Sequence, residues 1–469
     1  MKNVFYDVAV IGGGPAGSSF ATYARQRGLS VIVFEKEKFP RDHIGESLIP
    51  FTYWKLKELG IFEEIKKFAT YKPGVNFVDA DAKQQSTWCF GKILKDGSHM
   101  TYHTLRAPFD KALLDNAKKL GAEVFEEHKV KEINTEDVSG NVFLKVENKE
   151  GKVSDVSARF LIDASGQSSM MAKKLGVKIP YAGLDRTAFY SHWLNTTYDT
   201  ALQQGLIKII YLGGEKKGWF WVIPVGRNHL SIGVSLNNKY VREQKAKFAK
   251  ANSKNWVHDL YMQEVSYAPH LNTILEKADM EHEVTSIGDY SYYVENKYGK
   301  NYAMIGDAGA FLDPIFSSGV YVAMETSSRV INAVETTLKN GVEEGQKVFA
   351  KEYEIINGGY KLIEKFVRLF YSPELLNFAN ANPSDSNSYE ASIHAYNVFH
   401  YLLAGDFFDN HKLYCEFIDS IKNEKMYKRF IGLVQQRWNE TDMGQNCGYS
   451  FEDIYGHLDL KEQVAKVKS

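Results

Sequence analysis

The feature that most constrains the fold is a glycine-rich turn near the start of the chain. An apolar, β-branched run over residues 4–11 predicts a buried strand, a GxGxxG motif follows at 12–17, and 18–27 has helical character. A second apolar run at 30–35 predicts the next strand. In such a unit the glycines allow a tight turn, close approach to a pyrophosphate and close packing of helix on strand. The sequence therefore predicts a dinucleotide-binding lobe.

An acidic residue closes the second predicted strand. Glu35 lies 18 residues after Gly17, where a carboxylate can accept hydrogen bonds from an adenosine ribose. The N–H groups at the start of the helix would face the phosphates. The cofactor contacts expected in this unit are Gly12, Gly14, Ala16, Gly17 and Glu35. The motif by itself does not separate FAD from NAD.

A second motif favours FAD. Gly306 and Asp307 end another predicted strand at 301–306, and the chain continues to an Asp-Pro pair at 313–314. A carboxylate in this position can hold the ribityl hydroxyls of a flavin. A GxGxxG motif followed about 290 residues later by GD-x(5)-DP occurs in FAD enzymes of the flavin monooxygenase superfold. Residues 1–330 resemble that group, and DASG at 163–166 resembles its central strand motif.

The predicted fold class is α/β, with a Rossmann-like FAD-binding lobe of the flavin monooxygenase type, an antiparallel sheet lobe for substrate, and a helical C-terminal region. Residues 77–104 and 188–235 alternate in polarity and are rich in aromatics, which predicts the antiparallel sheet. After about residue 320 the pattern is helical, with a loop at 383–388. The expected domains are FAD-binding (1–75, 101–175 and 285–330), substrate-binding (76–100 and 176–284) and a helical C-terminal region covering the substrate pocket (331–469).

Three short motifs resemble those of flavin-dependent halogenases. WFWVIP at 219–224 matches the WxWxIP signature of that family, and HIGESLIP at 43–50 resembles a segment of its phenol- and pyrrole-type branch. DPIFSSGV at 313–320 resembles the halide-binding loop of that branch. The resemblance implies that reduced FAD and O2 convert chloride or bromide to hypohalous acid, which halogenates an electron-rich aromatic ring.

The resemblance also assigns roles to single residues. Trp219, Trp221 and Pro224 would separate the flavin from the substrate, although residues i and i+2 of a strand share a face and two such tryptophans also suit a core. Ser318 and Gly319 would offer backbone N–H groups to a halide. The same SSG segment also suits an ordinary helix start.

A lysine is expected to act on the halogen. Lys72 lies in a Lys-x-Gly-x-x-Phe stretch, 25 residues after Ser47, that matches the catalytic lysine of the resembled branch. Its ammonium would hydrogen-bond hypohalous acid, or, with a pKa lowered by desolvation, its amine would form a haloamine. Lys83 and Lys92 are weaker candidates. By the same resemblance, Arg41, Ser47 and Arg106 would contact FAD, although both arginines could be plain surface residues.

One departure from the family pattern bears on the substrate. Tryptophan halogenases carry a glutamate just before the serine of the halide loop, where Ile315 and Phe316 stand here. A phenol or a resorcinol delocalises positive charge through its own hydroxyl and needs less help. Phenolic, resorcinol-like or pyrrolic substrates are therefore expected, and indoles are disfavoured.

Composition limits the partners. Lys and Arg number 57 against 58 Asp and Glu, a net charge of −1 that speaks against nucleic acid as a partner. No stretch reaches the roughly 18 apolar residues of a membrane helix. Cys89, Cys415 and Cys447 are far apart and form no CxxC pair, so neither a metal site nor a disulfide is predicted. A reducing, cytoplasmic location is expected.

The halogenase interpretation implies a separate flavin reductase and a small aromatic substrate, either free or tethered to a carrier protein. An FAD-dependent aromatic hydroxylase or a prenyl-type reductase on the same fold is the alternative. A non-catalytic protein of the GDP-dissociation-inhibitor type is disfavoured by the intact Gly306–Asp307 motif and halide loop. The C-terminal aromatics, expected over the substrate pocket, are more typical of a core than of ligand contacts: Phe366, Phe370, Tyr371, Tyr401 and Phe407.

Overall fold

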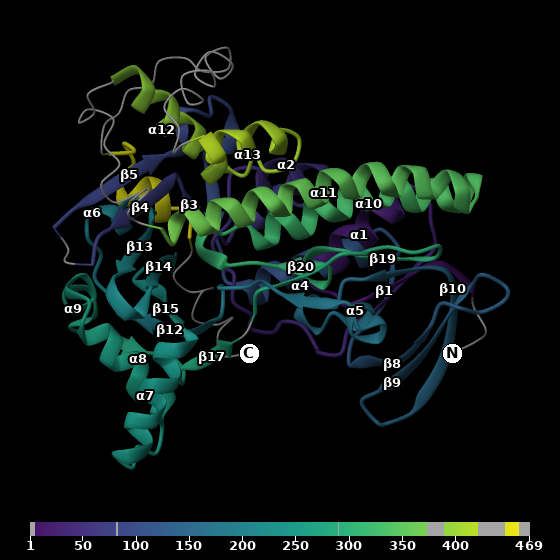
Figure 1. Ribbon diagram of the computed structural model, residues 1–469, viewed down its shortest axis with the longest axis horizontal. Coiled ribbons are helices and arrows are strands. Elements are labelled where there is room, and N and C mark those ends of the chain that lie inside the picture. Colours follow the sequence, from purple (N-terminus) through teal and green to yellow (C-terminus); the bar gives the residue numbers. More distant parts are fainter. Residues whose placement is uncertain (1–4, 81–82, 289, 373–388, 421–445, 459–469) are drawn as a thin grey trace.

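Two sheets lie side by side in the computed structural model, which describes residues 5–80, 83–288, 290–372, 389–420 and 446–458. Long helices run along the first sheet (Figure 1). The shorter helices α7 (Asn238–Lys250), α8 (Trp256–Ser266) and α9 (Pro269–Leu275) pack on the outer face of the second. The arrangement is mixed α/β, as the sequence predicts. The space between the two sheets holds the candidate site.

The first sheet contains the predicted βαβ unit. Its strand order is β7-β2-β1-β10-β9-β8, with β19 beside β10, and the strands next to β1 run parallel to it. The central strands are apolar because helices and a second layer cover both faces. The strands are β1 (Phe5–Ile11), β2 (Val31–Phe34), β7 (Glu123–Phe125), β8 (His128–Asn134), β9 (Val142–Asn148), β10 (Val153–Asp163) and β19 (Tyr302–Met304).

The helix of this unit, α1 (Pro15–Gln26), begins three residues earlier than the sequence predicts. Pro15 takes the first helical position, where its fixed φ suits a helix and its missing N–H costs nothing. The helix therefore starts inside the glycine motif, and its first turn faces the same space as the ends of β1 and β2.

The second sheet has eight strands in the order β16-β12-β15-β14-β13-β4-β5, with β17 beside β12. Most pairs are antiparallel, as predicted, but β4 and β13 are parallel. The segment after residue 89 leaves this sheet for two 3-10 turns and the separate β3–β6 pair. The strands are β4 (Gly74–Val78), β5 (Gln85–Cys89), β12 (Arg186–Leu194), β13 (Ile207–Leu212), β14 (Gly218–Gly226), β15 (His229–Asn237), β16 (Asp279–Met280) and β17 (Thr285–Gly288).

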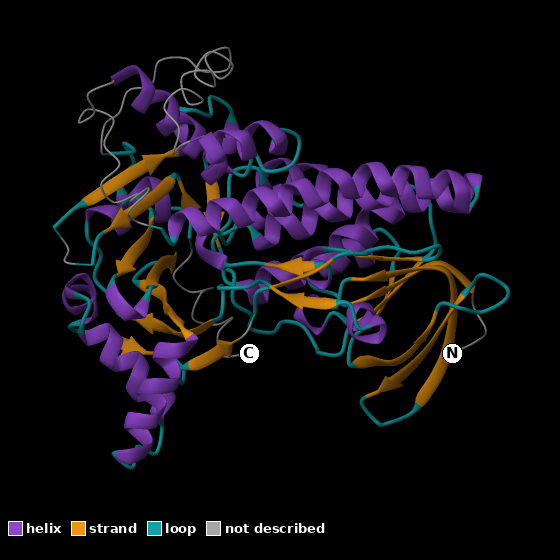
Figure 2. Cartoon of the chain, viewed as in Figure 1, coloured by secondary structure: helices purple, strands orange, loops and turns teal. Residues whose placement is uncertain are grey.

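Helices and small strands complete the molecule (Figure 2). The helices are α2 (Thr52–Glu58), α3 (Phe62–Lys66), α4 (Arg106–Lys119), α5 (Met170–Leu175), α6 (Thr200–Gln203), α7 (Asn238–Lys250), α8 (Trp256–Ser266), α9 (Pro269–Leu275), α10 (Gly319–Asn340), α11 (Val342–Phe370), α12 (Tyr389–Ala404), α13 (His411–Ser420) and α15 (Phe451–Tyr455). The short strands are β3 (Thr70–Lys72), β6 (Thr101–His103), β11 (Lys178–Pro180), β18 (Tyr292–Val294) and β20 (Ala310–Phe311).

The chain after residue 320 is mostly helical where it is described, as predicted, while the loop expected at 383–388 falls outside the described residues. No helix in the described ranges combines the length and the apolar character needed to cross a bilayer.

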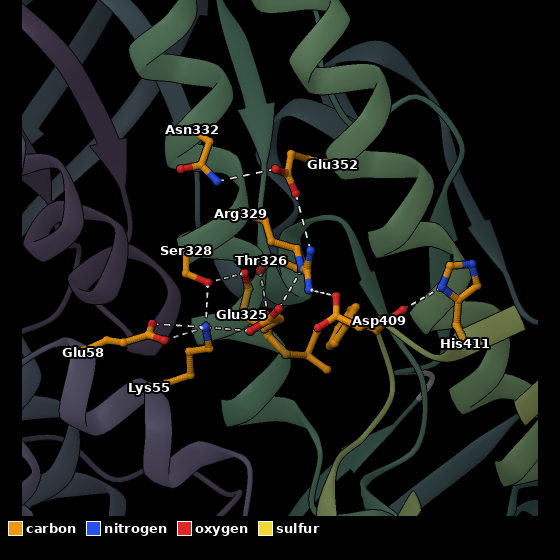
Figure 3. A network of polar contacts seen from close by, with 12 residues as sticks. Lys55, Glu58, Glu325, Thr326, Ser328, Arg329, Asn332, Glu352, Asp409 and His411 are labelled. Carbon is orange, nitrogen blue, oxygen red and sulfur yellow. Dashed lines mark hydrogen bonds and ion pairs between the residues drawn. The ribbon is translucent and has the colours of Figure 1, made fainter. Parts of the chain in front are cut away.

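A polar network connects the C-terminal helices α10 and α11 to α2 (Figure 3). Lys55 of α2 pairs with Glu325 of α10 at 2.9 Å, and Arg329 bonds Glu325 at 2.6 Å. Arg329 also reaches Glu352 of α11 and Asp409, which precedes α13. These ionic contacts fix α10 in place, and α10 begins at the predicted halide loop.

The cysteines depart from the prediction. Cys89 at the end of β5 and Cys447 form a disulfide, with their Cα atoms 5.4 Å apart, and Cys415 is free. The prediction that no disulfide forms is therefore wrong. Sequence spacing could not reveal it, since 358 residues separate two cysteines that only the tertiary fold brings together. The pairing removes the argument for a reducing compartment.

Candidate active site

A cavity of about 660 Å³ lies between the two sheets. Its lining joins the glycine turn, the ends of β2 and β10, the 43–47 segment, the inner face of β14 and the start of α10. The predicted cofactor, halide and separation residues that line it are Gly12, Gly14, Ala16, Glu35, Arg41, Ser47, Arg106, Trp219, Trp221, Asp307, Ser318 and Gly319. Segments about 300 residues apart in the sequence thus meet at one site.

The glycine motif has the geometry of a pyrophosphate cradle. Gly12 has φ +99°, and a Cβ there would overlap the carbonyl of Ala164. A Cβ on Gly17 would overlap the carbonyl of Gly12, so this glycine is required for helix and strand to pack. A Cβ on Gly14 would meet only the Arg41 guanidinium, at 3.6 Å. Gly14 therefore opens onto the cavity, where a phosphate group can approach the backbone.

Glu35 and Arg41 border the cavity next to this turn. The Glu35 carboxylate accepts hydrogen bonds from the Gly13 N–H at 2.7 Å and the Glu37 N–H at 2.9 Å. These bonds fix the carboxylate where a ribose hydroxyl can donate to its remaining lone pairs. Arg41 is paired with Glu37 and Asp110 and adds a positive charge near the expected phosphates.

The Gly306–Asp307 motif packs directly on the glycine motif. Gly306 has φ +55°, and a Cβ there would lie 3.1 Å from that of Ala16. Burial raises the pKa of Asp307 to about 7, although the charge of Arg106 opposes the shift. Arg106 is held by a bidentate pair with Asp110 and by the Ile44 carbonyl. A carboxyl group beside an open cavity suits the ribityl hydroxyls of FAD, so these residues fit the cofactor.

Two indoles form a wall of the cavity. Trp219 and Trp221 lie on one face of β14 with ring centroids 5.6 Å apart, and both are buried. Trp219 Nε1 donates to the Tyr371 hydroxyl at 2.8 Å. The Trp221 ring lies against Gly233 of β15, where a Cβ would overlap the ring. The wall therefore depends on a glycine in the neighbouring strand.

The predicted halide loop borders the same cavity. Ser317 has φ +55°, and after it Ser318 takes the N-cap position of α10 without a side-chain cap hydrogen bond, and Gly319 begins the helix. The first N–H groups of a helix have no acceptor within the helix. In this 22-residue helix they face the cavity of about 660 Å³, which we call the flavin cavity, and can bind an anion.

Lys72 lies behind Ser47 and outside the flavin cavity. Its Nζ donates to the Ser47 Oγ at 2.8 Å and to the Leu48 carbonyl at 2.7 Å. Burial lowers its pKa to about 7. It lines a second cavity of about 10 Å³, whose other lining residues are Val75, Phe77, Ile207, Ile209, Ile315, Phe316, Ser317 and Leu403. Ile207 and Ser317 line both cavities and therefore lie between them.

Some predicted residues lie elsewhere. Pro224 is buried in β14 and lines neither cavity. Gly306 is buried in a 3-10 turn and also lines neither cavity, whereas the next residue, Asp307, lines the larger one. Gly17 packs inside the turn. Lys83 and Lys92, the weaker lysine candidates, line neither cavity.

A network that the sequence did not indicate holds the tryptophan wall. The Tyr371 hydroxyl, which accepts from Trp219, donates to Asp313 at 2.8 Å. The Arg186 guanidinium lies 3.5 Å from the centre of the Tyr371 ring, and its Nε is 3.8 Å from Asp313. Asp313 belongs to a quoted motif and Tyr371 to the C-terminal aromatics, but nothing in the sequence linked them to Arg186.

Comparison with known proteins agrees with this geometry. A family model described as "FAD binding domain" matches residues 5–342. A 1H-pyrrole-2-carbonyl-[peptidyl-carrier protein] chlorinase from Pseudomonas fluorescens is 30% identical over 80% of this chain and 86% of its own length. The corresponding brominase from Pseudoalteromonas luteoviolacea is 29% identical over 81% and 89%.

Solved flavoprotein structures share the fold of this chain. A triple mutant of the flavin-dependent brominase Bmp2 has a TM-score of 0.73 at 26% identity, covering 89% of this chain and all of its own. A flavoprotein/dehydrogenase from Cytophaga hutchinsonii has a TM-score of 0.75 at 26% identity, covering 92% and 99%. FAD is the cofactor, and the chain belongs to the flavin-dependent halogenase family.

Proposed function

We propose that this protein halogenates an electron-rich pyrrolic or phenolic ring held beside Lys72, using hypohalous acid made in the flavin cavity. The observation that carries the proposal is the pair of cavities separated by Ile207 and Ser317. One cavity holds the cofactor residues and the halide loop, and the other holds a buried lysine. Bound FAD supplies electrons to O2, and the product oxidant is small enough to pass between the two spaces.

Each group of site residues has a separate proposed role, according to where it lies. The first N–H groups of α10, at Ser318 and Gly319, would hold the halide beside the flavin. Trp219 and Trp221 would exclude the arene from that space because their buried rings occupy the wall. The Lys72 ammonium would donate a hydrogen bond to hypohalous acid and make its halogen more electrophilic, or the neutral amine would carry the halogen itself. Its pKa near 7 gives both forms at neutral pH.

The proposed substrate is a pyrrole or phenol acyl group tethered to a carrier protein. Two relatives matched over most of their length act on carrier-bound pyrrole-2-carbonyl groups, which favours the tethered form here. The second cavity is lined mainly by aliphatic and aromatic side chains, which suit a flat ring. At about 10 Å³ it must widen to admit one, and Phe77, Phe316 and Leu403 are the side chains that would move apart.

Mass spectrometry of products tests this proposal. The protein would be incubated with a separate flavin reductase, NADH, FAD, O2 and either NaCl or NaBr. Substrates would be pyrrole-2-carboxylate, a resorcinol, and a pyrrole-2-carbonyl carrier protein. The expected result is a halogen isotope pattern on the carrier-bound ring and little on the free acid. Halogenation of the free ring only would contradict the carrier assignment, and addition of one oxygen would favour the hydroxylase alternative.

A further inference from the structure

A buried carboxylate in the flavin cavity is joined to the outside by two histidines. Glu46, which lines the cavity, is 1% exposed. Its Oε1 lies 2.6 Å from the Nε2 of His192 on β12. The other ring nitrogen of His192, Nδ1, lies 2.8 Å from the Nε2 of His282. His282 is only partly buried, so the hydrogen-bonded chain runs from the cavity to a residue that solvent reaches.

The acceptors around the two rings indicate where the protons lie. His282 Nδ1 is 2.8 Å from the Glu283 carbonyl, which can only accept, so Nδ1 carries a proton. Its Nε2 accepts from the His192 backbone N–H at 3.2 Å and is therefore unprotonated. His192 therefore donates from Nδ1 to His282 and from Nε2 to Glu46. An imidazole that donates from both nitrogens is an imidazolium. His192 therefore carries one extra proton beside the cavity.

Electrostatics support this protonation state. Burial by itself would lower the pKa of His192, but the charge and hydrogen bond of Glu46 raise it above its ordinary value. Burial would likewise raise the pKa of Glu46, and His192 lowers it on balance. The other charged and titratable groups that face the pair are Asp42, Arg106, Tyr190, His229 and Glu281.

The proposed reaction requires a proton at this place. One halide ion, one O2, reduced FAD with its two hydrogens, and one proton give hypohalous acid, water and oxidised FAD. Halogenation of the ring then releases a second water and consumes no further proton. The proton is thus taken up where the halide is oxidised, and Glu46 and the halide loop line the same cavity.

We propose that Glu46, His192 and His282 form a relay that delivers this proton from solvent to the flavin cavity. The His192 Nε2–H bond breaks as a Glu46 O–H bond forms, and the Glu46 carboxyl then gives the proton to the oxygen that leaves as water. His192 recovers its second proton from solvent through His282. The inference rests on the proposed function, because only a proton-consuming reaction in the cavity needs such a supply.

Single-turnover reactions without an aromatic substrate test the relay. The readouts are the hypohalous acid trapped per reduced FAD and the rate of flavin reoxidation. Glu46→Gln keeps the size of the side chain but cannot carry a proton, and it should lower the trapped yield at least about ten-fold while peroxide rises. FAD affinity and the reoxidation rate should stay near those of the parent. His258→Gln, at a side chain of α8 that is 44% exposed, is the matched control and should behave as the parent protein.

Two further measurements separate a relay from a structural ion pair. In the FAD-free protein, NMR titration of the His192 ring should give a pKa above the ordinary histidine value, and Glu46→Gln should bring it down. His282→Ala should lower the trapped yield, and imidazole buffer should restore it in proportion to its concentration, because the missing group is near solvent.

The failures are distinguishable. A parent protein that oxidises no halide would overturn the proposed function and the relay together. A parent that does so while Glu46→Gln gives an equal yield would overturn the relay alone. A lower trapped yield in His282→Ala that imidazole cannot restore would mean that Glu46, His192 and His282 form only a structural contact. A His192 pKa unchanged by Glu46→Gln would mean the same.

Discussion

Among single residues, Lys72 is the one on which the proposed reaction depends most. Its ammonium is bound to Ser47 and Leu48, so it is fixed where the lining of the flavin cavity meets the second cavity. The sequence indicated Lys72 through a family motif, but it could not show that Ser47, a predicted cofactor contact, is the group that holds it. That contact depends on the β3–β6 pair and the 43–50 segment lying side by side.

Replacing Lys72 by alanine should lower halogenation by about 100-fold or more, because the group that we propose activates the halogen is lost. Reoxidation of reduced FAD by O2 should continue at nearly the parental rate, since Lys72 lies outside the flavin cavity. Lys92→Ala is the control and should retain halogenation. The measurement is product formation alongside stopped-flow absorbance of the flavin, and normal halogenation in Lys72→Ala would contradict the assigned role.

Lys72 should also make stability depend on pH. Its pKa is about 7 when folded and near 10.5 when unfolded, so between these values the unfolded chain binds more protons. The cost of burying the ammonium is therefore complete below about pH 7 and shrinks as pH rises toward 10. The stability gained by Lys72→Met should be largest at or below pH 7 and fall by at most about 1.4 kcal/mol per pH unit above it. Urea unfolding of both proteins from pH 6 to 10 checks this, and a constant difference would contradict it.

The cofactor cradle makes a prediction at Gly14. A Cβ there meets no protein atom closer than 3.6 Å, so Gly14→Val should fold normally but exclude the pyrophosphate. We expect FAD affinity to fall at least about 100-fold, measured by quenching of flavin fluorescence, with an unchanged circular dichroism spectrum. Gly213→Ala, a glycine in open space, is the control. Unaltered FAD affinity in Gly14→Val would show that the pyrophosphate binds elsewhere.

At the scale of elements, β14 and β15 build the tryptophan wall together. Alternation along β14 directs Trp219, Trp221 and Ile223 to the cavity, which the spacing of the tryptophans could predict. Pro224 lies on the opposite face of the strand from Ile223 and so does not line the cavity, although it belongs to the family motif. The need for Gly233 across the strand could not be predicted, because register is set by the whole sheet.

Substituting Gly233 by alanine should disturb this wall. The new methyl group would overlap the Trp221 ring and force it to turn, at a cost of about 1–3 kcal/mol in unfolding free energy. Halogenated product per reduced FAD should fall while peroxide rises, because the flavin cavity is no longer closed. Chemical denaturation and peroxide release measure the two effects, and a variant with parental stability and yield would show that the strand pair tolerates the added group.

At the scale of the whole molecule, the sequence predicted the layers and the cofactor lobe because glycine and apolar patterns are local. It could not predict the parallel β4–β13 pair or the Cys89–Cys447 disulfide, which depend on contacts between distant segments. The same holds for the Glu46–His192–His282 chain, whose members lie on three separate segments. The domain boundaries given above and the role of the C-terminal helices as a cover remain predictions.

The disulfide should stabilise the fold by restricting the unfolded chain. It joins β5 to the segment that carries α15, and His457 of that segment stacks on Tyr71 next to Lys72. Cys447→Ser should lower the unfolding free energy by about 2–5 kcal/mol under oxidising conditions. Cys415→Ser, at the free cysteine, should have little effect. Equal thermal unfolding of parent and Cys447→Ser would mean that the bond does not form in solution.

We propose that a halogen, and not the arene, crosses between the two cavities. The most direct measurement is one turnover of the parent protein with reduced FAD, bromide, isotope-labelled O2 and the carrier-bound ring, followed by mass spectrometry. We expect a product with the two-isotope pattern of bromine and no labelled oxygen. A product that carries labelled oxygen would mean that the ring itself reaches the activated oxygen, and would rule out the transfer of a halogen between the cavities.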